Sequence, residues 1–389
     1  MRTHQRIVFP VLFTCVFLFM FTEVLLSPFY PQFFRKVFGV EDFGFTGFYI
    51  FACRLTVVIA SPIWGLVSRK VDSRWLLLIG QVGTAISCVL MALSANAYQF
   101  LAFSVLLLIF KSSYLLLYTI MIQAAGQEKK NVTGVYHAVI QTAIIAATVM
   151  SGWVIGLANP LQVFWWIALL DFLQAAVCFF VLRRVAIIDN SIPAEADTML
   201  KNRVDIRFLA KMALLIFTLH YAVNIIRPFF TVFTEETYHT TIIGSSLLFL
   251  IPSLMAVAAL PVMKKCSSQR ILSLYKMSGL LLLISLVLQG VASNLWVLIL
   301  ARCLFGFTLA VCQASLDMYL FERSRNVHSD YSVLSSFQNI GLLLAPLSAL
   351  ALVEDYSIVS PFIAAGVIFV VHLFVVTITS YRKRTVHKI

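Results

Sequence analysis

The stretch "LRRVAIIDNSIPAEADTMLKNRVDIR", residues 182–207, is the longest polar interruption in an otherwise apolar chain of 389 residues. Its charges and Pro193 are typical of a connection between structural units, because neither suits the interior of a membrane helix. Hydrophobic runs of membrane-spanning length lie on both sides of it. We therefore predict an N-terminal half over residues 1–182, a linker over 183–206 and a C-terminal half over 207–389.

The composition places both halves in a membrane. The chain is 61% hydrophobic and 12% charged, whereas soluble domains carry about 25% charged residues. Runs that are long and apolar enough to cross a bilayer as helices lie near residues 7–30, 44–67, 75–95, 98–124, 132–157, 162–182, 207–233, 242–263, 271–292, 295–321, 333–353 and 358–381. We predict an all-α membrane protein with twelve transmembrane helices, six in each half, surrounded by a lipid bilayer.

The basic residues predict the orientation of these helices. Almost every Lys and Arg outside the spans lies in alternate connections, which include the linker and both ends of the chain. The other connections have none apart from Arg35 and Lys36. Since basic loops remain in the cytoplasm, we expect the linker and both termini there, in a bacterial inner membrane. The net charge of +12 then reflects topology, and we expect no nucleic-acid partner.

The pattern of reactive residues does not predict an enzyme. The seven cysteines form no CxxC pair, and six lie in apolar runs, which is typical of packing residues. No span carries a metal-binding cluster or a serine–base arrangement, and no loop carries a Walker motif. We therefore expect no metal, no cofactor and no catalytic residues. We also expect a monomer, with transport driven by the proton gradient.

The two halves show weak internal repeats. "SPFYPQFF" at residue 27 is similar to "RPFFTVFT" at 227, an offset of 200, and "SRKVDSRWLL" at 68 is similar to "KKCSSQRILS" at 264, an offset of 196. Gln141 and Gln338 lie 197 residues apart. Agreement of these offsets within a few residues predicts two parallel six-helix repeats related by a pseudo-two-fold axis.

With these features the chain resembles the major facilitator superfamily, and more loosely its bacterial drug/proton antiporter-like branch. The loop "GLVSRKVDSR" matches the family's cytoplasmic loop at Gly65 and Arg74, but Arg69 stands where the family has an acidic residue. In the family that acid helps to lock a cytoplasmic gate. Our hypothesis is that Asp72 takes part of this role, and the alternative is a solvated loop charge.

The segment "RCLFG", Arg302 to Gly306, also matches the family, in its tenth-helix pattern Arg-x-x-x-Gly. The corresponding fourth-helix position holds Ser104, and Lys111 lies seven residues deeper, on almost the same helix face. The resemblance implies a central cavity lined by eight of the twelve helices. It also implies transport by alternating access.

Six charged residues lie well inside the spans, where contact with lipid is costly: Glu23, Arg54, Lys111, Asp171, Arg227 and Arg302. From these and from nearby polar or aromatic residues we predict a substrate site of Arg54, Lys111, Tyr114, Tyr118, Asn224, Arg227 and Arg302. Glu23, His220 and Asp171 are candidates for proton coupling. We place the cytoplasmic gate at Gly65, Arg69, Asp72 and Arg74.

Three of these residues have a structural alternative. Arg302 could instead bond backbone carbonyls, Arg227 could extend to the outer headgroups, and Asp171 could join two helices by hydrogen bonds. A fourth alternative concerns Glu23: it and Arg54 lie about 10 and 15 Å from the outer ends of adjacent helices, so they could form a permanent structural ion pair.

Positive charge dominates the predicted lining helices, with four cations against one anion. A low-dielectric cavity of one sign concentrates ligands of the other sign. We therefore predict a proton-coupled secondary transporter of a small organic anion, such as a carboxylate metabolite or a polycarboxylate siderophore. Glu23 would alternate between pairing with Arg54 and carrying a proton. The alternative is a proton-driven multidrug exporter that binds lipophilic cations at Glu23.

Overall fold

The computed structural model describes residues 2–68, 70–114, 117–118, 120–121, 129–183, 206–264, 270–323 and 327–386. The chain divides into two compact units, Met1–Ile192 and Pro193–Ile389, and each is described by itself. Residues 184–205 of the predicted linker and the predicted gate residue Arg69 lie outside the described residues.

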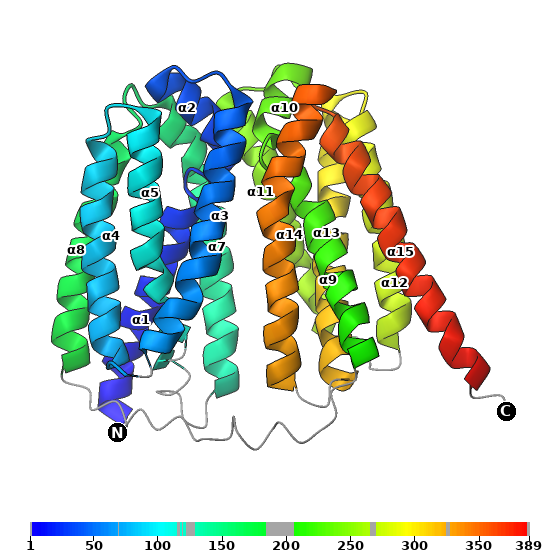
Figure 1. Ribbon diagram of the computed structural model, residues 1–389, viewed down its shortest axis with the longest axis horizontal. Helices are drawn as coiled ribbons and strands as arrows, with labels where there is room; N and C mark the ends of the chain where they lie inside the picture. The colour runs from blue at the N-terminus through cyan, green and yellow to red at the C-terminus, as the bar shows by residue number, and fades with distance from the viewer. Residues whose placement is uncertain are drawn as a thin grey trace. The chain divides into compact units, whose positions relative to one another are not determined.

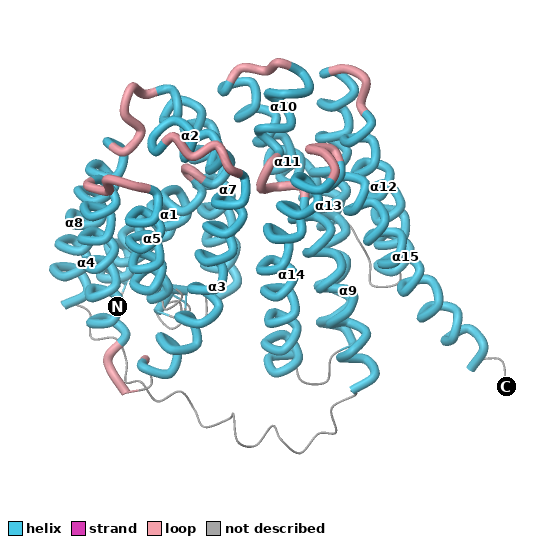
Figure 2. The backbone as a smooth tube through the Cα atoms, turned by 45° about the horizontal axis from the view of Figure 1, so that its top comes forward, coloured by secondary structure: helices cyan, strands magenta, loops and turns pink. Residues whose placement is uncertain are grey.

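Both units consist of helices, and the described residues contain no strand (Figure 1 and Figure 2). The first unit comprises α1 (Arg2–Val24), η1 (Ser27–Phe29), α2 (Tyr30–Phe38), α3 (Phe43–Val67), α4 (Ser73–Ala92), α5 (Ala97–Lys111), η2 (Ser112–Tyr114), α7 (Lys129–Gly156) and α8 (Gln162–Arg183). The second comprises α9 (Ile206–Ile225), α10 (Phe230–Tyr238), α11 (Ile242–Lys264), α12 (Ile271–Val291), α13 (Leu295–Arg323), α14 (Val327–Asp355) and α15 (Ser360–Val386). Twelve segments are long and apolar enough to cross a membrane, which confirms the predicted number of spans.

The first helix of each unit is broken at the same place in the repeat. α1 ends at Val24, and α2 runs to Phe38; in the second unit the corresponding break lies between α9 and α10. Proline at 28 and at 31 suits the starts of short helices, since it lacks an N–H and has a helical φ. Gly39 and His239, 200 residues apart, both end the short helix in a left-handed conformation, with φ of 66° and 52°.

The units also match in their caps and in their helix pairs. Asn96 accepts a hydrogen bond from Gln99 N at the start of α5, and Asn294 accepts one from Val297 N at the start of α13. Within the first unit α1 packs on α7, α3 and α4 on α5, and α4 on α8; within the second α9 packs on α14, α11 and α12 on α13, and α12 on α15. The repeat predicted from the sequence is therefore also a repeat of three-dimensional structure.

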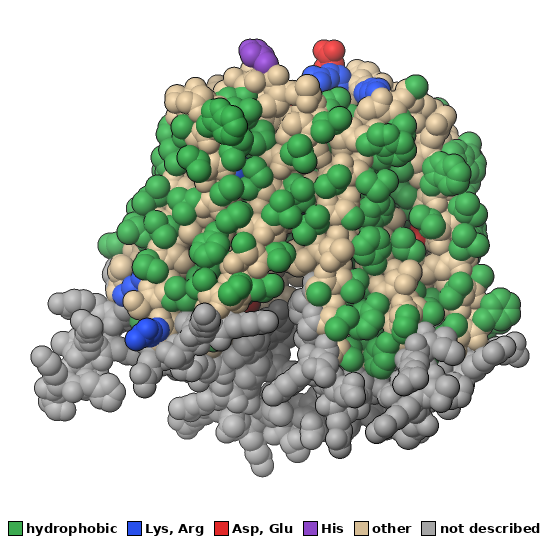
Figure 3. Space-filling model, turned by 180° about the vertical axis from the view of Figure 1, so that it is seen from behind, with side chains coloured by type: hydrophobic (Ala, Val, Ile, Leu, Met, Phe, Trp, Pro, Cys, Tyr) green, Lys and Arg blue, Asp and Glu red, His purple; other side chains and the backbone are tan. Residues whose placement is uncertain are grey.

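Large apolar side chains cover the outside of the helices (Figure 3). Trp153, Trp166 and Phe374 are each at least 60% exposed. A soluble protein rarely exposes apolar surface on this scale, whereas lipid solvates it without cost. The backbone polar groups meanwhile bond within the helices, as the absence of water in hydrocarbon requires.

The packing of α13 on α11 depends on Gly306. A Cβ added there would lie 2.3 Å from Pro252 Cα, and it would also contact the carbonyl group of the same residue. The neighbour is main chain in the middle of a helix, so it cannot rotate aside as a side chain can. Gly306 therefore sets how closely the two helices approach.

We expect Gly306→Ala to destabilise the protein by about 1–3 kcal/mol, because overpacking forces the two helices apart. Gly156→Ala is the control, since nothing lies within 4 Å of a Cβ built at that helical position. Thermal unfolding in detergent should show a lower melting temperature for the first variant only. Equal melting temperatures for the two variants would contradict the packing described here.

Candidate functional site

The buried charge of the first unit centres on Lys111, the last residue of α5. Its side chain is 6% exposed. The ammonium group donates a hydrogen bond of 3.1 Å to Thr22 Oγ1 on α1 and lies 4.9 Å from the centre of the Phe19 ring. These contacts hold the charged end of Lys111 against α1, well inside the membrane-spanning part of the unit.

A small cavity lies beside Lys111, and Asp171 of α8 lines it with Thr22, Thr84 and Tyr114. Asp171 is 7% exposed. The charges of Glu23 and Asp171 both act on Lys111, yet no ion pair joins these residues within 4.0 Å in the part of the chain that is described. The structure thus brings together Lys111, Tyr114 and Asp171, which the sequence had assigned to separate substrate and proton roles.

The two tyrosines of the predicted substrate site lie in packed surroundings. Tyr114 is 5% exposed and stacks on Phe19 with 4.7 Å between ring centres, and its hydroxyl accepts a hydrogen bond of 3.2 Å from Gln174 Nε2. Tyr118 lies with its ring 4.7 Å from that of Tyr136 on α7.

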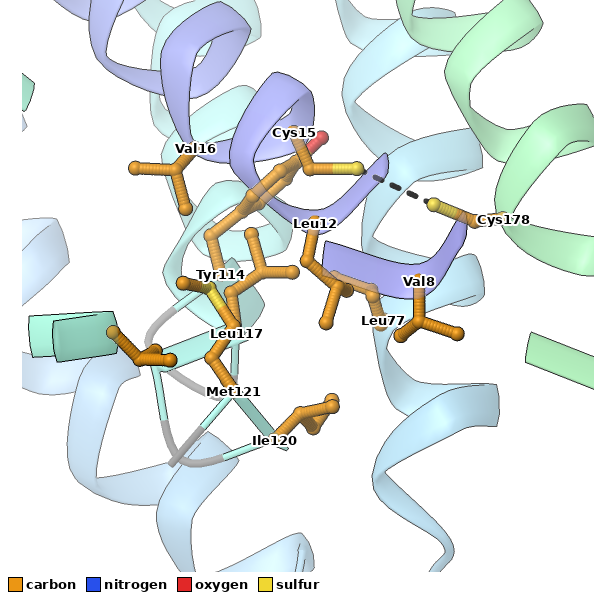
Figure 4. Packing of buried hydrophobic residues seen from close by; sticks show 11 residues of the cluster. Val8, Leu12, Cys15, Val16, Leu77, Tyr114, Leu117, Ile120, Met121 and Cys178 are labelled. Atoms are coloured by element: carbon orange, nitrogen blue, oxygen red, sulfur yellow. Dashed lines mark hydrogen bonds between the residues drawn. The ribbon is translucent and has the colours of Figure 1, made fainter. Parts of the chain in front are cut away.

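Figure 4 shows Tyr114 among apolar residues of α1 and α4 and beside the pair Cys15–Cys178, whose sulfur atoms are 3.3 Å apart. Tyr114 is therefore part of the unit's core, and only its hydroxyl end reaches polar groups.

Glu23 and Arg54 share one neighbourhood but do not pair. Both charges act on Tyr30 and on Cys53, and both side chains are half-buried. Among the described contacts, however, neither residue has a hydrogen bond or an ion pair through its side chain. The predicted Glu23–Arg54 pair is thus open in this conformation, and an intramembrane guanidinium is left with its donors available.

Arg302 of α13 is 4% exposed and has its donors occupied by the protein. Pro252 has no N–H, so the Leu248 carbonyl one turn earlier in α11 lacks its helical partner. Arg302 Nε donates to that oxygen at 3.2 Å, while Nη2 donates to Phe249 O at 3.3 Å and Nη1 to Gln289 Oε1 at 3.1 Å. These bonds favour the structural alternative for Arg302 over a substrate contact, because one of them satisfies the Leu248 carbonyl that Pro252 leaves free.

The corresponding position of the first unit also joins two helices. Ser104 on α5 accepts a hydrogen bond of 3.0 Å from the hydroxyl of Tyr49 on α3. In the second unit the guanidinium of Arg302 additionally lies 4.0 Å from the centre of the Phe230 ring. The repeat thus uses this position to tie the α3–α5 and α11–α13 pairs, with different chemistry in each unit.

Hydrogen bonds link Arg227, two residues beyond the end of α9, to polar groups in the last turns of that helix. Arg227 is exposed; its Nη1 donates to Asn224 Oδ1 at 3.3 Å, and the guanidinium lies 5.6 Å from the centre of the Phe249 ring. Asn224 Nδ2 in turn donates to the backbone oxygen of His220 at 2.7 Å. The exposed position at the end of α9 fits both an outer-headgroup contact and a contact with a soluble anion.

An ion pair joins Asp72, just before α4, to Arg74 in the first turn of that helix. Asp72 is the N-cap of α4: Oδ1 accepts a hydrogen bond of 2.9 Å from Arg74 N, and Oδ2 pairs with the Arg74 guanidinium. Bonding to that guanidinium lowers the pKa of Asp72 below its usual value. Gly65 is exposed near the end of α3. Asp72 is therefore more than a solvated loop charge, and its role between the halves remains a hypothesis.

Sequence reasoning did not single out His372, which is fully buried in α15. The Thr218 hydroxyl donates to Leu214 O at 2.7 Å, so its oxygen is left to accept from His372 Nδ1, also at 2.7 Å. Tyr275 then donates to Nε2 at 2.6 Å. A histidine inside an apolar run was the available signal. Within the described residues no three His, Cys, Asp or Glu side chains gather as a metal site would need.

We expect Arg302→Gln to lower the free energy of unfolding by about 1–3 kcal/mol, because it leaves buried carbonyls of α11 without donors. Arg227→Gln is the matched control, since that guanidinium is exposed. Melting temperatures in detergent measure the difference. A larger loss in the control than in Arg302→Gln would exclude the structural role.

We expect Asp72→Ala to cost about 1 kcal/mol at neutral pH, the usual value of a helix N-cap, and Asp72→Asn to cost less because the amide oxygen still caps. Since the folded pKa of Asp72 is lowered, its contribution is present above the unfolded value and is lost as the pH falls through the folded value. The difference between wild type and Asp72→Ala should shrink below about pH 4. A pH-independent difference in melting temperature would contradict this.

Comparison with known proteins agrees with this architecture. The family model of the Major Facilitator Superfamily matches residues 12–272 and 212–388. The staphyloferrin B transporter of Staphylococcus aureus (strain NCTC 8325 / PS 47) is 23% identical over 371 residues, which cover 90% of this chain and 86% of that protein.

Two solved structures share the fold. The human organic anion transporter MFSD10 (TETRAN) has a TM-score of 0.69 at 18% identity, over 96% of this chain and 99% of the other. A mutant of the nucleoside transporter NupG has a TM-score of 0.72 at 14% identity, over 94% of this chain and 99% of the other. The chain therefore belongs to the Major Facilitator Superfamily, as a multi-pass membrane transporter and not an enzyme.

Proposed function

We propose that this transporter is a proton-coupled secondary carrier of a small organic anion, of the polycarboxylate siderophore class. The supporting observation is the state of Arg54. It is half-buried in a membrane-spanning helix, and no described hydrogen bond or ion pair satisfies its five donors. Such a group is costly inside a membrane unless a ligand or water bonds it. A carboxylate is the ligand that a guanidinium binds best, because two parallel hydrogen bonds form.

Two of the four cations that the sequence assigned to the substrate have other surroundings in the structure. Arg302 is occupied by backbone carbonyls and Gln289, and Lys111 is placed near two carboxylates. Arg54 therefore remains as the cation of the first unit that we assign to the substrate. Its planar fork of donors suits a carboxylate group, which accepts two parallel hydrogen bonds.

Two of the three similar proteins have names in keeping with this chemistry, and the third is a nucleoside transporter. One is a transporter of staphyloferrin B and another is an organic anion transporter. We extend the substrate class, and not a particular substrate, to this chain. We further place both termini and the linker over residues 183–206 in the cytoplasm, on the strength of the basic connections. That the chain is a monomer in a bacterial inner membrane stays a prediction.

We expect a polycarboxylate such as citrate or staphyloferrin B to raise the melting temperature of the purified protein, since a ligand of the folded state stabilises it. Arg54→Gln should abolish the shift. Arg207→Gln, an exposed arginine at the start of α9, is the control and should retain it.

The multidrug alternative makes the opposite prediction for the same experiment. Stabilisation by tetraphenylphosphonium and not by polycarboxylates, lost in Glu23→Gln, would replace the anion proposal, because Glu23 also lacks a described side-chain partner.

A further inference from the structure

We propose that Arg54, Glu23, Lys111 and Asp171 act as one charge relay, through which an anion bound at Arg54 causes Asp171 to take up one proton. Anion and proton would then be carried in the same direction. The inference rests on the proposed function, since it requires an anion at Arg54. It adds the proton-binding residue and the sign of the coupling.

The four residues form a continuous series within the first unit. Arg54 and Glu23 both act electrostatically on Tyr30 and Cys53. Lys111 Nζ donates at 3.1 Å to Thr22, the neighbour of Glu23 in α1, and Lys111 and Asp171 line one cavity. Each residue in the series thus shares its surroundings with the next, although no direct ion pair within 4.0 Å joins any two of them in the described part of the chain. Small rearrangements can therefore change which partner balances which charge.

The charges of the series sum to zero when every group is ionised. Two cations face two carboxylates, so Arg54 balances Glu23 and Lys111 balances Asp171. One carboxylate group of the anion, paired with Arg54, adds one negative charge to the series in a region of low dielectric, where an unbalanced charge is expensive. Glu23 then has Lys111 as its remaining cation, and Asp171 is left without one. Protonation of a carboxylate oxygen of Asp171 restores neutrality.

Asp171 is better placed than Glu23 to receive this proton. It is 7% exposed and lines the small cavity, whereas Glu23 is half-buried near Arg54. The cavity is large enough for a water molecule, and the hydroxyl groups of Thr22 and Thr84 line it together with Lys111. A water bonded there can deliver the proton to the Asp171 oxygen.

The other ionisable groups that act on Asp171 do not offer a competing charge. They are the Cys88 thiol of α4, the Tyr114 hydroxyl of η2 and the Cys15 thiol of α1. All three are at most 5% exposed, and neutral thiols and phenols are their stable forms in such surroundings. Lys111 is thus the cation on which the state of Asp171 depends.

Proton uptake on anion binding tests the relay directly. The purified protein, in weakly buffered detergent solution with a pH indicator, is mixed with citrate or staphyloferrin B. Wild type should take up about one proton per bound anion, and the dissociation constant should rise about tenfold per pH unit while Asp171 is ionised in the free protein. Asp171→Asn should bind the anion with a pH-independent affinity and take up no proton.

Two further variants separate the relay from folding defects. Lys111→Met combined with Asp171→Asn leaves no unbalanced buried charge, so it should fold and bind the anion without proton uptake. Glu41→Gln removes an exposed loop carboxylate of the same unit and should behave as wild type.

The possible failures are distinguishable. Absence of anion binding in wild type would overturn the proposed function itself. Anion binding without proton uptake in wild type, or uptake that persists in Asp171→Asn and in the double variant, would overturn the relay and leave the anion carrier intact.

Discussion

Hydrocarbon offers no hydrogen bonds, and this constraint accounts for most of the polar interior of the protein. Pro252 illustrates it: the proline frees a carbonyl in α11, and Arg302 supplies the missing donor from α13. Gly306, one turn further along α13, allows the two helices to come close enough for that bond. The two residues of the motif Arg302-x-x-x-Gly306 thus act together. Arg302 supplies the hydrogen bond that Pro252 removes from α11, and Gly306 lets the two helices approach closely enough for that bond to form.

The same constraint separates the polar groups that have described partners from those that do not. In the second unit Arg302 bonds three oxygens, and His372 has both ring nitrogens occupied by hydroxyl groups. In the first unit Lys111 has one described hydrogen bond, to Thr22, and Arg54 and Glu23 have none through their side chains. Satisfied groups stabilise a structure, whereas unsatisfied ones can exchange partners with a ligand or a proton.

Much of the fold could be predicted from the sequence, because its signals are local. Spans follow from runs of apolar residues, and the break at "SPFYPQFF" follows from the backbone chemistry of proline. The repeat was visible because its offset, near 200, recurs in separate motifs. The site could be predicted only in part. The position of Lys111 along its span predicts that it lies inside the membrane. Its neighbours Thr22 and Asp171 are 89 and 60 residues away in the chain, so only the packing of the helices brings them together. The occupation of Arg302 likewise depends on a proline 50 residues earlier.

Arg302 of the second unit has described hydrogen bonds and Arg54 of the first unit has none through its side chain, so substitutions at the two positions should have different effects. A substitution at Arg302 loses bonds that the α11–α13 pair needs whatever solute is carried. A substitution at Arg54 removes no described bond, so its effect falls on recognition and not on folding. Of these two intramembrane arginines, the one in the first unit can therefore change with the solute that is carried, whereas the one in the second is fixed by the packing of its helices.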